Sequence, residues 1–184
     1  MNICLSHNDS PTPLCLVAEK YHCDKAPSIF HNYTPVYYHL FQKREIRRIF
    51  EVGVAHGASL RMWAEYFPDA EIHGIDNNIA CIFQEERIHT YLCDASNAEE
   101  LRREVESLGG NFDLILDDAS HIPKDQILAA SLLFEYLRPR GLLIIEDVND
   151  PVQVSQGIAH PHVILELEST SIADDRLIVI ERRE

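Results

Sequence analysis

The chain has 184 residues and a net charge of −14, with 46% of its residues hydrophobic and 25% charged. This length and composition favour one globular domain, and no apolar run of about 18 residues is present to form a transmembrane helix. The acidic balance repels phosphate backbones, so nucleic acid is excluded as the expected substrate.

The start of the sequence and the cysteines indicate the compartment. Residues 1–13 lack the basic region and the long apolar stretch of a signal peptide. The five cysteines show no Cys-x-x-Cys spacing, so neither a zinc site nor a disulfide framework is expected. We therefore expect a cytoplasmic protein with reduced thiols and no membrane contact.

Residues 1–45 are predicted to form an N-terminal helical segment that covers the functional site. A short helix is expected around residues 14–22. A second helix is expected to begin near Thr34, a capping residue that precedes a proline at the first helical position. Residues 46–184 are predicted to form the compact core domain, because strand-like and helix-like patterns alternate from Arg48 onward.

The core domain is predicted to contain a parallel sheet with helices on both faces. Strand patterns occur at residues 47–54, 70–76, 87–93, 112–118 and 142–148. Helix patterns occur at residues 58–67, 78–86, 97–109 and 123–137.

The last two strand patterns differ from the first five. Residues 162–169 and 176–183 are joined by too few residues for a crossover helix, so they are expected to pair antiparallel. The predicted fold class is therefore α/β: a three-layer, Rossmann-like sheet of seven strands, mostly parallel, with a C-terminal antiparallel hairpin.

Notable polar residues fall where the predicted strands end, which is where open α/β sheets bind ligands. Gly53 and Gly57 bracket a tight turn that lets a ligand approach the backbone. Their G-x-x-x-G spacing is not the G-x-G-x-x-G of dinucleotide-binding proteins, which disfavours a nicotinamide oxidoreductase. Asp76 is placed either to accept hydrogen bonds from ribose hydroxyls or to cap a helix, and a capping role is equally open for Asp94.

Acidic residues end the next two strands. Asp118 and the pair Glu146 and Asp147 are expected on neighbouring strands, where three carboxylates repel each other unless a cation lies among them. Oxygen ligands suit magnesium. The alternative is that these acids cap helices and solvate loops. Asp117 points to the opposite face from Asp118 and is better placed for cofactor or structural hydrogen bonds.

His121 lies three residues after Asp118 in the sequence. An imidazole with an ordinary pKa near 6.5 can accept a proton at neutral pH, so His121 is the candidate general base. None of the other histidines is expected to have a comparable setting.

Residues 49–76 and 112–148 resemble class I S-adenosylmethionine-dependent methyltransferases. Within that class, "DDASH" at 117–121 and "IIED" at 144–147 are similar to the metal-dependent O-methyltransferases of antibiotic biosynthesis, which methylate sugar hydroxyls on macrolides. "HNYTPVYYHLF" at 31–41 also resembles the segment that precedes the core in that branch. The large amino-terminal region of the macrolide enzymes is absent from this sequence.

The resemblance implies a role for each candidate residue. Glu51, Gly53 and Gly57 would shape the pocket for the methionine end of S-adenosylmethionine, Asp76 would bind its ribose and Asp94 would lie beside its adenine. Ser59 and Asp117 are further candidates for contact with the cofactor. Magnesium would be held by Asp118, Glu146 and Asp147, and His121 would be the base.

The implied function is methyl transfer from S-adenosylmethionine to a hydroxyl of a small molecule, assisted by magnesium. Two alternatives remain open: a metal-independent or nitrogen-directed methyltransferase, and a non-catalytic partner subunit that binds the cofactor or nothing. Without a separate lid domain in this sequence, the roof of the pocket must come from residues 1–45, from residues 148–161 or from a second subunit, which makes a homodimer plausible.

Overall fold

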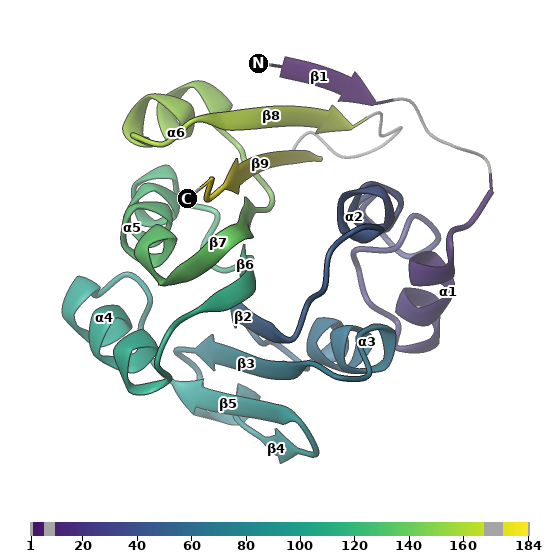
Figure 1. Cartoon of the computed structure of the whole chain (residues 1–184), viewed down its shortest axis with the longest axis horizontal. Helices are drawn as coiled ribbons and strands as arrows, with labels where there is room; N and C mark the ends of the chain where they lie inside the picture. Colours follow the sequence, from purple (N-terminus) through teal and green to yellow (C-terminus); the bar gives the residue numbers. More distant parts are fainter. Residues whose placement is uncertain (1, 6–9, 168–174, 184) are drawn as a thin grey trace.

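The computed structural model describes residues 2–5, 10–167 and 175–183 (Figure 1). In these ranges a sheet of nine strands runs through the molecule in the order β1-β8-β9-β7-β6-β2-β3-β5-β4. The strands are β1 Asn2–Leu5, β2 Arg48–Val52, β3 Glu71–Asp76, β4 Gln84–Glu85, β5 Ile88–Leu92, β6 Phe112–Asp117, β7 Leu137–Ile145, β8 His162–Leu167 and β9 Arg176–Glu181.

The predicted seven-stranded core is confirmed. The neighbouring strands β5, β3, β2, β6 and β7 pair in parallel, whereas β9 lies antiparallel between β7 and β8. All six residues of β6 are buried, as expected for a central strand covered on both faces. Strand order reverses at β2, so the carboxyl ends of β2, β3 and β6 meet at the switch point where ligands bind in such sheets.

Two short edge strands extend the sheet beyond the prediction. β1 adds in parallel to β8, and β4 pairs antiparallel with β5. Residues 78–86 do not form the expected helix: Ile79–Cys81 is a single 3₁₀ turn, η1, and β4 follows it. The Thr90 hydroxyl accepts from the Phe83 backbone N–H at 2.6 Å, which ties this segment to β5.

Helices cover both faces of the sheet (Figure 1). One face carries α1 Pro13–Lys20, α2 Thr34–Phe41 and α3 Ala58–Tyr66. The other carries α4 Ala98–Ser107, α5 Pro123–Leu133 and α6 Pro151–Gly157, with the short η2 Phe134–Tyr136 after α5. Each face buries its own apolar cluster, and none of these helices is long and apolar enough to cross a membrane.

Both N-terminal helices have a proline at one of their first two positions, as helix-start chemistry predicts. The Thr12 side chain caps α1 by accepting from the Cys15 backbone N–H at 3.3 Å. α2 begins at Thr34 as expected, but the Thr34 hydroxyl donates to Cys15 Sγ instead of capping its own helix. This contact joins α1 to α2, and the segment between them, residues 21–33, lies against the functional site described below.

Candidate active site

A cavity of about 730 Å³ opens at the carboxyl ends of the central strands. Six of the residues predicted to contact a cofactor or metal line it: Gly53, Ser59, Asp76, Asp94, Asp117 and Asp118. Tyr21, His22 and Asp24 of the N-terminal segment line the same cavity, so that segment forms part of its wall.

The glycine turn after β2 lets the chain pass close to the next strand end. Gly53 has a φ of +96°, and a Cβ atom there would lie 2.0 Å from the Asp118 carbonyl oxygen. Only glycine fits this crossing. The backbone N–H groups of Val54 and Ala55 both donate to Asp76 Oδ2, at 3.0 and 3.1 Å. Asp76 therefore fixes the turn while it lines the cavity, and Gly57 lies outside the lining at the start of α3.

Asp94 and Asp117 both line the cavity, but they differ in burial and in hydrogen bonding. Asp94 Oδ1 accepts from the Ser96 backbone N–H and hydroxyl at 2.9 and 2.7 Å, so it holds a turn. Asp117 is buried, and its Oδ2 accepts no hydrogen bond from the described residues. Burial, reinforced by the charge of Asp118, raises the pKa of Asp117 to about 7. An unsatisfied buried oxygen in the cavity wall is suited to a ligand's hydrogen-bond donor.

Glu51 lies beneath the cavity instead of in its wall. Its side chain is fully buried, and Trp63 Nε1 donates to its Oε2 at 2.7 Å. Burial raises the pKa of Glu51 to about 7, although the charge of Lys25 opposes that shift. Its other oxygen, Oε1, has no hydrogen-bond partner within the described ranges.

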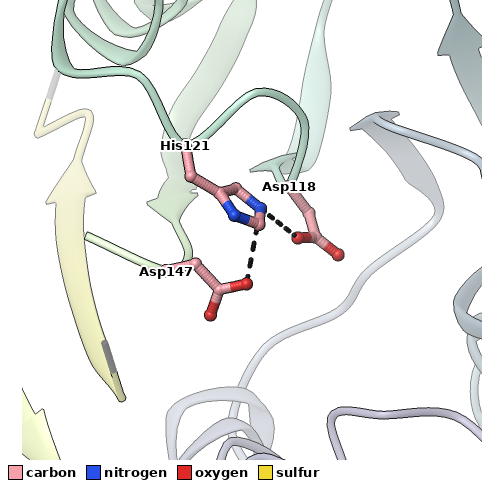
Figure 2. A group of neighbouring side chains, drawn as sticks. All are labelled: Asp118, His121 and Asp147. Carbon is pink, nitrogen blue, oxygen red and sulfur yellow. Dashed lines mark hydrogen bonds and ion pairs between the residues drawn. The ribbon is translucent and has the colours of Figure 1, made fainter. Parts of the chain in front are cut away.

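Beside the cavity, Asp118, His121 and Asp147 converge (Figure 2). His121 Nε2 lies 3.3 Å from Asp118 Oδ1 and 3.4 Å from Asp147 Oδ2. His121 and Asp147 both have positive φ angles, +54° and +50°, an uncommon backbone state for these residues that turns both side chains toward one point. The hydrogen bond to Asp118 raises the pKa of His121, although burial opposes it.

Sequence reasoning missed a buried lysine in this cluster. Lys25, in the segment between α1 and α2, is 1% exposed, and its Nζ donates to Glu146 Oε2 at 2.6 Å and also to Asp118 Oδ2. Burial lowers the pKa of Lys25, but the nearby carboxylates outweigh this effect and hold the pKa well above its ordinary value. The same ammonium helps to hold the pKa of Asp118 below its usual range, against the effect of burial.

Tyrosine and histidine side chains from the N-terminal segment also contact the carboxylates of this cluster. Tyr37 donates to Glu146 Oε1 at 2.6 Å, and Tyr33 donates to Asp147 Oδ1. The His31 ring stacks on Tyr33, with Nδ1 2.7 Å from Asp175 Oδ1 and Nε2 3.6 Å from Asp147 Oδ1. The expectation that His121 alone has such a setting is therefore wrong, because His31 also lies between two carboxylates. The run "HNYTPVY" at 31–37, rich in polar aromatic residues, is the signal that could have indicated these contacts.

The donor set fits a divalent cation. One donor atom from each of Asp118, His121 and Asp147 lies within 4.8 Å of the others, and the carboxylate oxygens match the preference of magnesium or manganese. Glu146, the third predicted ligand, lies next to this group, but Lys25 and Tyr37 already occupy both of its oxygens.

No family model matches the sequence. Among curated proteins, the chain is 35% identical over 147 residues to 8-demethyl-8-(2-methoxy-alpha-L-rhamnosyl)-tetracenomycin-C 3'-O-methyltransferase of Streptomyces olivaceus, covering 75% of this chain and 37% of that protein. It is 36% identical over 127 residues to mycinamicin VI 2''-O-methyltransferase of Micromonospora griseorubida, covering 64% of this chain and 32% of that protein. The chain thus spans about a third of the length of these relatives.

Solved structures show the same architecture. The MycE methyltransferase of mycinamycin biosynthesis, in complex with Mg, SAH and mycinamycin VI, matches with a TM-score of 0.73 and 25% identity over 96% of this chain and 55% of that one. A putative O-methyltransferase from Klebsiella pneumoniae matches with a TM-score of 0.63 and 19% identity over 96% of this chain and 92% of that one.

The fold and the cavity at its switch point define the class: this chain has the Rossmann-like fold of the class I S-adenosylmethionine-dependent methyltransferases. Within that class its sequence is related to the O-methyltransferases of antibiotic biosynthesis. The resemblance predicted from the sequence is confirmed.

Proposed function

We propose that the chain transfers a methyl group from S-adenosylmethionine to a hydroxyl of a small molecule, such as a sugar or another natural product, with the help of a divalent cation. The observation that carries this proposal is the cluster of Asp118, His121 and Asp147 beside the cavity. The relatives support the choice of acceptor, since their names specify O-methylation of a rhamnosyl tetracenomycin C and of mycinamicin VI.

The cofactor would occupy the 730 Å³ cavity. The turn at Gly53 allows close approach to the backbone, and Asp76 offers carboxylate oxygens to ribose hydroxyls. Asp94 would lie beside the adenine. Asp117 would accept a hydrogen bond from the methionine end through its unpaired oxygen, with Ser59 in the same wall. Gly57 would contribute by shaping the turn between β2 and α3. Glu51 would support the cavity from beneath.

Asp118 and Asp147 would hold the cation, and Glu146 would join them if its contact with Lys25 opened. Magnesium in proteins commonly uses one or two carboxylates and fills its other positions with water or substrate oxygens. When bound, the cation would supply Lewis acidity that lowers the pKa of the acceptor hydroxyl. Asp118 and Asp147 also fix the His121 ring between them.

His121 would accept the proton of the acceptor hydroxyl at Nδ1, because Nε2 faces the carboxylates of Asp118 and Asp147 and therefore carries the ring proton. The acceptor oxygen would then form its bond to the methyl carbon as the carbon–sulfur bond breaks, so that one proton ends on His121 and the electron pair on the departing sulfur. Because the methyl group carries its own leaving group, most of the acceleration would come from positioning and from exclusion of water.

Binding and transfer measured together would test this proposal. Isothermal titration with S-adenosylmethionine, S-adenosylhomocysteine and NAD should show binding of the first two only, with and without magnesium. Methyl transfer to rhamnosylated or macrolide acceptors should require magnesium. Cofactor binding without transfer to any hydroxylated acceptor would favour the non-catalytic partner subunit, and transfer in EDTA would favour a metal-independent enzyme. The homodimer and the cytoplasmic location stay predictions from the sequence.

A further inference from the structure

Lys25 places an ammonium group among the carboxylates that are proposed to hold a metal. Its Nζ contacts Glu146 Oε2 at 2.6 Å and pairs with Asp118 Oδ2, while its side chain is 1% exposed. A buried charge of this kind is stable only when it is paired, so the two carboxylates and Lys25 stabilise one another.

The ammonium lies between two oxygens that a bound cation would share. Lys25 Nζ donates to Asp118 Oδ2 and Glu146 Oε2, so a divalent cation held by these two residues would compete with the ammonium for their oxygens. Two cations at neighbouring positions also repel each other strongly in a buried environment. Lys25 and a metal therefore oppose each other at Asp118 and Glu146.

Glu51 offers the ammonium a second position. Its Oε1 lies 3.9 Å from Lys25 Nζ and accepts no hydrogen bond from the part of the chain that the structure describes. Lys25 Nζ and Glu51 Oε1 already form an ion pair at this distance. A short movement of the Lys25 side chain toward Glu51 would bring the ammonium within hydrogen-bond distance of this buried oxygen and would release the oxygens of Asp118 and Glu146. The ammonium would remain buried and paired in either position.

We propose that Lys25 is an intramolecular cation that competes with the divalent metal for Asp118 and Glu146 and moves toward Glu51 when the metal enters. The proposal rests on the metal site of the proposed function. Lys25 thereby holds metal affinity down and keeps the carboxylates neutralised when no metal is bound. It also couples the metal site to the N-terminal segment, because the backbone N–H groups of Tyr33 and Thr34 donate to the Lys25 carbonyl at 3.2 and 3.1 Å.

The first test is metal affinity without cofactor or substrate. Lys25→Met removes the ammonium and keeps most of the side-chain volume, so Mn²⁺ titrated by electron paramagnetic resonance should bind roughly tenfold more tightly or better. Mn²⁺ should also raise the melting temperature more in the variant than in the wild type. The matched control is Lys20→Met, since Lys20 pairs with Glu65 on the surface with 59% of its side chain exposed. Equal or weaker Mn²⁺ binding by Lys25→Met, or no binding by either protein, would overturn the proposal.

The second test uses the wild-type protein, so it does not depend on the folding of a variant. Hydrogen exchange is measured with and without saturating Mg²⁺. Competition predicts faster exchange at the amides of Tyr33 and Thr34, whose acceptor is the Lys25 carbonyl, and slower exchange at residues 118–121 and 147. Slower exchange at all of these amides would mean that the metal and Lys25 coexist, which contradicts the proposal. Neither test uses methyl transfer, so failure of the proposed activity would be seen separately.

Discussion

The two halves of the candidate site are built differently. The cavity half, with Gly53, Asp76 and Asp94, consists of strand ends and the turns that follow them, held by contacts among the core strands and turns. The cation half joins strand ends to the N-terminal segment through Lys25, Tyr33 and Tyr37, across 93 to 121 residues of sequence. The cavity half is therefore built mainly by the sheet, with Tyr21, His22 and Asp24 adding part of the wall, whereas the cation half depends more strongly on how the N-terminal segment docks.

The largest expected effect would come from removing the cation. Activity on any accepted acceptor should be lost in EDTA and should return with magnesium, and Asp147→Asn should have the same effect because it removes a carboxylate charge from the cluster. Cofactor affinity, measured by titration, should change little in either case, since Asp147 does not line the cavity. Full activity in EDTA would mean that catalysis does not require a cation in this half of the site.

His121→Ala should lower turnover by roughly 10²–10⁴-fold, the usual effect of a positioned acid–base group. The raised pKa of His121 keeps the imidazole protonated at low pH, so the wild-type rate should rise as pH increases and His121 loses its proton. A bound cation would lower the pKa of His121, so the rise of the rate would occur at lower pH.

A pH–rate profile of both proteins would test the role of His121. The rate of His121→Ala should not show the rise with pH that is expected for the wild type. The control is His89→Ala, because His89 lies on β5, away from the cluster, with 38% of its side chain exposed. Near-normal turnover in a folded His121→Ala protein would rule out the general-base role.

Asp76→Ala should weaken S-adenosylmethionine binding by more than roughly tenfold, because it removes a charged acceptor from the cavity wall and releases the turn at Val54 and Ala55. Mn²⁺ binding should stay unchanged, which would show that the two halves are independent. The exposed Asp69, replaced by alanine, is the control for charge alone. Unchanged cofactor affinity in folded Asp76→Ala would remove Asp76 from the cofactor site.

The smallest expected effect concerns stability and pH. With a folded-state pKa of about 7, against about 3.9 in the unfolded chain, Asp117 keeps a proton that the unfolded chain releases. The contribution of Asp117 to the free energy of unfolding should therefore fall as pH rises from about 4 to about 7. Asp117→Asn, which cannot titrate, should flatten the dependence of melting temperature on pH in EDTA, whereas Asp69→Asn should not. An identical slope in Asp117→Asn and wild type would mean that Asp117 is ionised in the folded protein.

Local sequence patterns determined the core strands, the helices on both faces and the polar residues at the strand ends. Strand and helix periodicity is a property of neighbouring residues, and parallel strands bring their carboxyl ends to one edge. The convergence of Asp118 and Asp147 could therefore be predicted. The glycine turn could also be predicted, because it lies between a strand pattern and a helix pattern. The close approach of Gly53 to the Asp118 carbonyl appears only in the tertiary structure.

Only the tertiary structure decided what neutralises the carboxylates. Lys25 lies in a polar segment with no periodic pattern, and its pairing with Glu146 across 121 residues depends on the docking of α1 and α2. The pairing of His31 with Asp175 spans 144 residues for the same reason. Edge strand β1 likewise pairs with a strand near the other end of the chain. The sequence alone thus determined where charge gathers, because strand ends are a local property, whereas packing between distant segments determined which cation lies there.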